Sequence, residues 1–110
     1  MRPFAIAGGL LLAACSTTPA GSGRIAPQAS VHYADLRLDD PAAQDILVVR
    51  VREAALSYCR EHAAVVTPHH RRAEAAYCPA SIRVQLIWAM PPELRRAYDQ
   101  GWRRSDRRMR

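Results

Sequence analysis

The chain has 110 residues and a formal net charge of +6 at pH 7, and all sixteen of its basic residues are arginine. This length allows one small domain, and a domain of that size tends to be marginally stable unless a cross-link such as a disulfide supports it. The sequence contains no Gly-rich phosphate loop, no G-x-S-x-G turn and no H-E-x-x-H helix, which argues against the enzyme classes that carry those motifs.

The first fifteen residues have the pattern of an export signal. Residues 1–2 form a short basic start, and residues 3–14 are uncharged and rich in leucine and small side chains. A membrane-spanning helix needs about 20 consecutive apolar residues, so this run is too short to cross a bilayer. Its end, "LAAC" at 12–15, resembles the lipobox of bacterial lipoproteins. The resemblance implies that residues 1–14 are removed and that Cys15 is lipidated and anchors the chain to a membrane.

The residues around the cleavage point bear on where the protein lies. Ser16, and not aspartate, follows the cysteine, and by the same resemblance this favours an outer-membrane lipoprotein facing the periplasm. The alternative is an ordinary signal peptide cut near Ala14 or Ala20. Nine of the fifteen residues 16–30 are Ser, Thr, Pro or Gly, so we expect the lipidated cysteine and a flexible tether to occupy residues 15–30.

Residues 31–92 are expected to form the folded domain. Its first element, over residues 31–38, is predicted to be a strand. Val31 and Tyr33 alternate with polar neighbours, and Leu36 and Leu38 continue the alternation on the opposite parity, which indicates a strand with a bend between the two pairs. Such a strand needs a partner. The candidate partners are residues 63–66 and 82–88.

A long helix should follow. Asp39 and Asp40 precede Pro41, a typical helix start, because a short carboxylate accepts free amide hydrogens and proline gives up no needed donor. No breaker intervenes up to about His62. The apolar face predicted for this helix comprises Leu47, Val51, Ala54, Ala55 and Tyr58.

The second half of the domain is less regular in sequence. Thr67-Pro68 predicts a shorter second helix that runs to Cys78, where Pro79 interrupts it. Residues 80–90 fit a helix, yet 82–88 also alternate as a strand would. The fold class is therefore mainly α with a short N-terminal strand, or α+β if 82–88 is a strand.

A last helix should begin at Pro92-Glu93, and residues 93–110 form a basic C-terminal helix or tail. One side of this helix carries its apolar residues. These are Leu94, Ala97, Tyr98, Gly101 and Trp102.

Two cysteines remain once Cys15 is lipidated. An exported protein meets an oxidising compartment in which disulfides persist. A bridge between Cys59 and Cys78 would close a loop of 18 intervening residues and contribute about 3 kcal/mol in the chain-entropy estimate. We therefore expect a small, disulfide-bridged helical domain.

A pattern of apolar and charged positions runs from the predicted strand into the long helix. Its members are Val31, Tyr33, Asp35, Leu36, Leu38, Pro41, Leu47, Arg50, Val51, Ala54, Ala55 and Cys59. Together they resemble the UrcA family of small exported bacterial proteins, and Cys78 falls where that family tends to place a second cysteine. The resemblance implies a strand-like segment, a long helix and a disulfide. It supplies no activity and no catalytic residue.

The region between the two cysteines contains candidate metal ligands. His62, His69 and His70 lie there, and with the thiols they would suit zinc. The spacing matches no strong zinc signature, however, and in an oxidising space the sulfurs would sooner bond each other. No C-x-x-C pair occurs either, and Asp35 and Glu53 are scattered single carboxylates with no sign of a paired general acid and base. We expect no catalytic residue, no metal site and no cofactor; the alternative is a thiol- or metal-dependent enzyme or metal-binding protein using Cys59, Cys78 and these histidines.

Residues 93–110 hold seven arginines against three acidic residues. Such a segment attracts the phosphates of anionic lipid or lipopolysaccharide, with aromatic rings at the interface; the other interpretation is a solvated chain end. The same composition would suit nucleic acid, which an exported protein seldom meets, so none is expected as a partner. The expected function is that of a non-enzymatic, membrane-anchored envelope lipoprotein, a structural or interaction module. The predicted contact residues are Arg95, Arg96, Trp102, Arg103, Arg104, Arg107 and Arg108.

Overall fold

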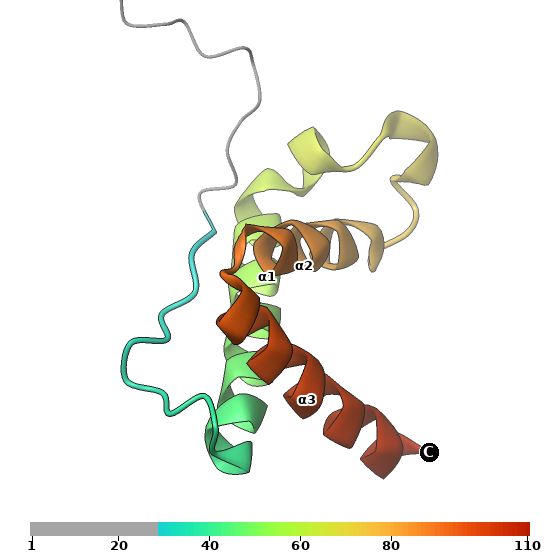
Figure 1. The fold of residues 1–110 in the computed structure, drawn as a ribbon. Helices are drawn as coiled ribbons and strands as arrows, with labels where there is room; N and C mark the ends of the chain where they lie inside the picture. Colours follow the sequence, from blue (N-terminus) through green and yellow to red (C-terminus); the bar gives the residue numbers. More distant parts are fainter. Residues whose placement is uncertain (1–28) are drawn as a thin grey trace, which may run out of the picture.

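The structure, a computed structural model, describes residues 29–110, which form a mainly helical domain. The elements in chain order are α1 (Pro41–Val66), a 3-10 turn η1 (His69–Arg71), α2 (Tyr77–Ala89) and α3 (Pro92–Met109) (Figure 1). The predicted signal sequence, Cys15 and most of the tether lie outside the described residues. Among residues 29–110, none of the helices combines the length and hydropathy that a membrane crossing requires.

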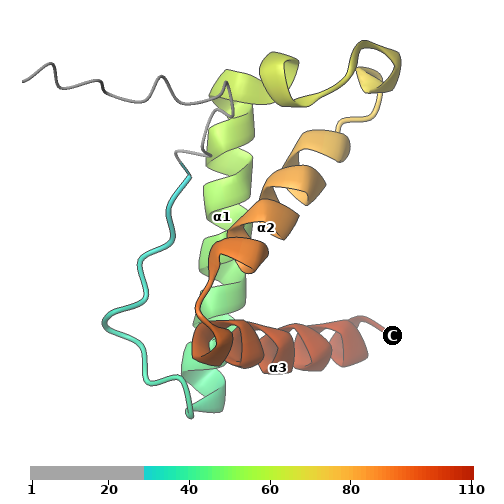
Figure 2. The same ribbon diagram turned by 45° about the horizontal axis from the view of Figure 1, so that its top comes forward.

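The long helix α1 is the spine on which the other helices pack. α2 crosses its C-terminal half and α3 crosses its N-terminal half, and the two meet at a sharp corner around Pro91 (Figures 1 and 2). Residues 29–40, which we call the strap, run back along another side of α1. The core therefore lies where one side of α1 meets α2 and α3.

The start of α1 follows the prediction, and its end lies further along than predicted. The Asp40 carboxylate accepts a hydrogen bond of 3.0 Å from the amide of Ala42, and Pro41 occupies the first turn. The helix continues to Val66, because nothing breaks it until Thr67, whose backbone is extended. A residue before a proline is disfavoured in helical geometry, so Pro68 ends α1 from one residue away.

The predicted N-terminal strand is absent from the described residues. The strap contains a turn in which the Leu36 amide donates to the Tyr33 carbonyl oxygen (3.0 Å), and this turn produces the change of parity that the sequence shows. Neither of the two candidate partner segments can pair with the strap, because both are helical. Val31, Leu36 and Leu38 are instead partly buried against the core.

The middle of the chain also differs from the prediction. A 3-10 turn and further turns occupy the place of the expected helix from Thr67 to Cys78, and α2 begins only at Tyr77. Pro79 lies in the first turn of α2, where its missing amide hydrogen costs no intrahelical bond. Pro79 is therefore tolerated within the first turn of α2 and does not interrupt a helix. Residues 82–88 are helical, which confirms the mainly α class.

A disulfide ties α1 to α2 inside the core. Cys59 and Cys78 are bonded, with their Cα atoms 5.9 Å apart, as predicted. Both are buried, at 8% and 3% exposure. The largest side chains that are fully buried come from all three helices. They are Leu47 and Val51 of α1, Ile82 of α2 and Tyr98 of α3.

Candidate functional site

The basic C-terminal segment is a packed helix. Pro92 and Glu93 begin α3, and Arg107 and Arg108 lie in its last turn, so acidic and basic residues lie at the ends that the helix dipole favours. Its buried residues face the rest of the domain. Gly101 lies so close to α1 that a β carbon there would stand 2.6 Å from the carbonyl oxygen of Gln44.

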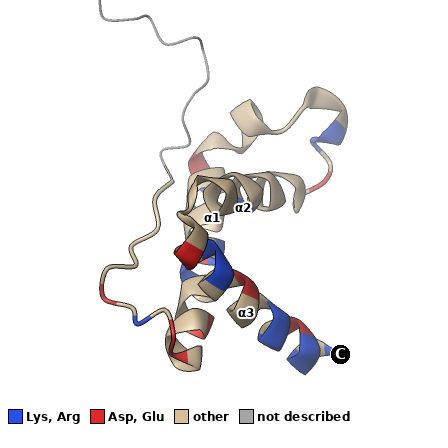
Figure 3. Cartoon of the chain, viewed as in Figure 1, with Lys and Arg blue, Asp and Glu red and all other residues tan. Residues whose placement is uncertain are grey.

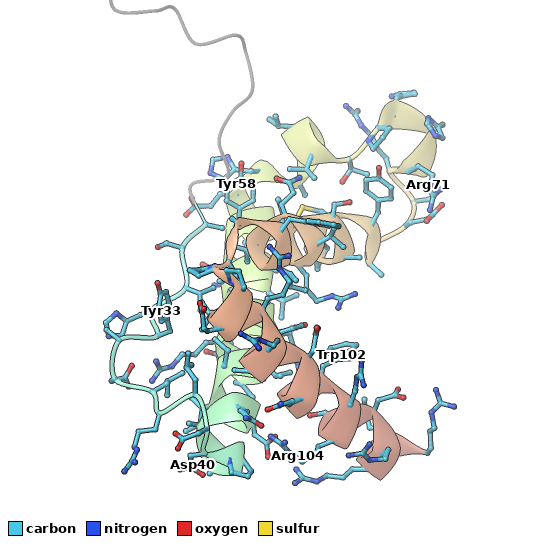
Figure 4. All side chains as sticks on the ribbon, viewed as in Figure 1. Tyr33, Asp40, Tyr58, Arg71, Trp102 and Arg104 are labelled. Carbon is cyan, nitrogen blue, oxygen red and sulfur yellow. A yellow bond between two sulfur atoms is a disulfide. The ribbon has the colours of Figure 1, made fainter. Side chains whose placement is uncertain are left out.

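Two of the seven predicted contact residues hold α3 to the start of α1. Arg104 donates to the Asp45 carboxylate at 3.0 Å and to the carbonyl oxygen of Pro41 at 2.9 Å. Arg108 donates to the other oxygen of Asp45 at 3.4 Å. Figure 4 shows Arg104 on the side of α3 that faces the N-terminal end of α1. These two arginines therefore stabilise the packing of α3 on α1.

A third arginine closes the corner between α2 and α3. Arg95 donates to the carbonyl oxygens of Ile87, Trp88 and Met90 at 3.1 to 3.2 Å. Its guanidinium also lies 5.3 Å from the centre of the Trp88 ring. The last carbonyls of a helix have no partner within it, so Arg95 acts as a side-chain cap for α2.

The remaining three arginines face solvent together. Arg96, Arg103 and Arg107 are exposed and take part in no hydrogen bond or ion pair with residues 29–110. Their spacings of seven and four residues place them along one face of the helix, which we call the outer stripe. Figure 3 shows basic residues along α3 toward its C-terminal end. The outer stripe is the part of the predicted contact group that remains available to a partner.

Trp102 is the last predicted contact residue, and it belongs to a different surface. Its ring stacks with Tyr98, with centres 6.1 Å apart, and the guanidinium of Arg83 lies 4.6 Å from its centre. It borders a groove of about 260 Å³ at the junction of the three helices. The groove is lined by Val48, Arg52, Ala55, Pro79, Ala80, Arg83, Tyr98 and Trp102.

The sequence analysis did not find Arg52 and Arg83. They lie on α1 and α2, far in sequence from the basic segment, and no spacing rule joins them to Trp102. Only the crossing of three helices brings them to one groove. The helical periodicity of α1 gave the sole hint, because it places Arg52 close to the apolar positions 48 and 55.

A bidentate ion pair joins the strap to α1. The Arg50 guanidinium donates to both carboxylate oxygens of Asp35, at 2.7 and 2.8 Å, and to the carbonyl oxygen of His32 at 2.9 Å. The hydrogen bond from Arg50 lowers the pKa of Asp35 from 3.8 to about 2, although desolvation opposes the shift. The same hydrogen bond raises the pKa of Arg50.

In the part of the chain that the structure describes, the cysteines and histidines do not converge on one site. The disulfide occupies both sulfurs, so neither thiolate is available as a ligand or nucleophile in this form. The His62 ring packs against Tyr58 on α1 with its plane tilted by 38°, whereas His69 and His70 lie in η1. Within residues 29–110, no three His, Cys, Asp or Glu side chains are grouped to hold a metal ion.

Searches against protein-family models, curated proteins and solved structures find no match for this chain. The resemblance to the UrcA family therefore stays a prediction.

Proposed function

We propose that this protein is a non-enzymatic, lipid-anchored envelope protein whose domain is an interaction module for anionic phosphate surfaces. Cys15 is the proposed anchor, and the outer membrane, on its periplasmic side, is the proposed location. The observation that carries the proposal is the outer stripe. Arg96, Arg103 and Arg107 stay free while their neighbours on α3 are used in folding.

The expected binding energies give the anchor and the outer stripe different roles. Two or three acyl chains hold a protein on a bilayer far more firmly than one does. A basic residue near an anionic surface contributes about 1 kcal/mol, so three contribute about 3 kcal/mol at most. The tether keeps the domain within reach of the surface, and the local concentration lets a weak contact act. The outer stripe then orients the domain on the membrane or on lipopolysaccharide.

The test compares two triple variants of the non-lipidated protein, which carries Cys15→Ser so that the anchor does not mask the contact. R96Q/R103Q/R107Q should bind vesicles of phosphatidylglycerol and phosphatidylcholine about 100-fold more weakly than the parent. The control, R37Q/R60Q/R72Q, removes the same charge from exposed arginines of other segments and should change binding much less. Equal losses in the two variants would mean that only net charge matters, and would refute the proposal.

The anchor has a separate test. The intact mass of the mature protein, measured before and after reduction, reports the cleavage site, the fatty acids and the disulfide together. We expect a chain that begins at Cys15 and carries acyl groups. An unmodified chain that begins after Ala20 would refute the lipid anchor.

A further inference from the structure

The groove at the junction of the three helices has an apolar floor and a basic rim. Val48 and Ala55 of α1 and Pro79 and Ala80 of α2 supply aliphatic surface. The rings of Tyr98 and Trp102 supply a flat aromatic wall from α3. Figure 4 shows Trp102 on the side of α3 that is turned toward α2. Such a mixture of apolar surface and a few polar groups is typical of small-molecule sites.

Two guanidinium groups border the groove without a carboxylate to neutralise them. Arg52 takes part in no hydrogen bond or ion pair with residues 29–110. Arg83 donates one long hydrogen bond, of 3.5 Å, to the hydroxyl of Tyr98. A guanidinium carries five N–H donors, so most of the donors of both side chains remain free for a ligand.

Arg83 is also held in place before any ligand arrives. It is only partly exposed, and its guanidinium lies over the Trp102 ring at 4.6 Å. Stacking on an aromatic face fixes the planar group and leaves its edge free for oxygen acceptors. Little side-chain entropy is then lost when an anion binds.

We propose that this groove binds a small amphiphilic anion, an oxyanion head group carrying a short apolar chain. The head group, a carboxylate or a phosphate monoester, pairs with Arg83 and Arg52, because the guanidinium fork matches two oxygens at once. The chain lies on the apolar floor. The volume of about 260 Å³ corresponds to about nine water volumes of about 30 Å³ each, which suits a ligand of about ten non-hydrogen atoms.

This site does not depend on the proposed membrane contact. The outer stripe lies on another face of α3 and shares no residue with the groove. Loss of vesicle binding and loss of ligand binding are therefore separate results, and either proposal survives the failure of the other.

The experiment follows Trp102 fluorescence in the full, oxidised chain with Trp88→Phe, because the other indole is 72% exposed and would obscure the signal. Octanoate and octyl phosphate are the two probes, and octanol is the neutral control with the same chain length. We expect saturable binding of at least one anionic probe below its micelle concentration and none of octanol. The stronger of the two identifies the head group.

Variants locate the binding. R83Q should weaken it about tenfold, since a hydrogen-bonded charge pair is lost, and R60Q, on an exposed part of α1 outside the groove, should leave it unchanged. A80L fills the floor without altering charge and should abolish binding while circular dichroism stays that of the parent. The proposal fails if octanol binds as well as the anions, if neither anion binds, or if A80L and R83Q bind like the parent.

Discussion

Replacement of Gly101 by alanine should destabilise the domain, even though alanine is the better helix former. In an open helix the change would contribute about 1 kcal/mol of stability. Here the added β carbon would meet the Gln44 carbonyl oxygen at 2.6 Å, the Gln44 carbonyl carbon at 2.9 Å and Val48 Cγ2 at 2.9 Å. Two of these three atoms belong to the backbone of α1 and cannot rotate away.

The magnitude follows from the shift that relieves the overlap. Ordinary contacts of a β carbon begin near 3.4 Å, so α3 must move about 0.8 Å away from α1 at this point. A gap of 0.5–1 Å forfeits about a quarter to a half of the attraction between facing atoms. Overpacking of this kind typically costs about 1–3 kcal/mol. Because the closest atoms belong to the Gln44 backbone and cannot rotate away, we expect the upper part of that range, about 2–3 kcal/mol. After the gain of about 1 kcal/mol in helix propensity, the expected net loss is about 1–2 kcal/mol.

The assay is urea unfolding of the oxidised protein, followed by circular dichroism. R103A, on the exposed face of the same helix, is the matched control and should stay within about 0.5 kcal/mol of the parent. In a V48A background the penalty of G101A should persist, because the closest contact is to the backbone of Gln44. A G101A protein as stable as the parent would refute the close approach of α3 to α1.

Two further predictions concern the ties outside α3. Because folding lowers the pKa of Asp35 from 3.8 to about 2, the pair with Arg50 stabilises the protein above about pH 4, and this contribution is lost as the pH falls toward 2. D35N should therefore be less stable at pH 7 and should lose stability less steeply between pH 5 and pH 2 than the parent; parallel acid curves would contradict the ion pair. Replacing Cys59 and Cys78 by alanine should lower the free energy of unfolding in urea at pH 7 by about 3 kcal/mol, because the bond closes a loop of 18 intervening residues. A decrease below about 0.5 kcal/mol would contradict a stabilising role for the disulfide.

The helices that could be predicted are those whose signals are local. Asp40 and Pro41 start α1, and Pro92 starts α3, because capping and proline chemistry act within one turn. The errors arise where one residue has two readings. A proline breaks a helix when it lies in the middle and is tolerated when it lies in the first turn. Because α2 begins at Tyr77, Pro79 lies in the first turn.

The strap differs from the prediction in its backbone conformation. Alternation of apolar residues around Val31 and Leu38 is typical of a strand. The same residues here cover α1, and no strand lies beside them within residues 29–110. Alternation reports that one side of a segment is buried. Whether the backbone pairs depends on what lies beside it, and the candidate partners prefer helix. The pair between Asp35 and Arg50 joins this segment to α1.

The basic helix could be predicted as a helix, whereas the roles of its arginines could not. Arg95 caps α2, Arg104 and Arg108 pair with Asp45, and Arg96 with Arg103 faces solvent. Seven arginines in one segment look equivalent in composition. What distinguishes them is the angle around α3 and the group opposite, which depends on how α3 crosses α1. A charge count therefore overstates the binding surface.

The residues that carry the resemblance to the UrcA family act in the fold. Asp35 and Arg50 clamp the strap to α1, Leu47 and Val51 are fully buried, and Cys59 forms the disulfide. None of the residues of that pattern belongs to the outer stripe or lines the groove with Arg83 except Ala55. Proteins that share this pattern would share a fold and a disulfide. Their binding residues could still differ, because the pattern does not include them. The two surfaces proposed here lie almost wholly in residues that the pattern does not include, so their function has to be measured on this chain itself.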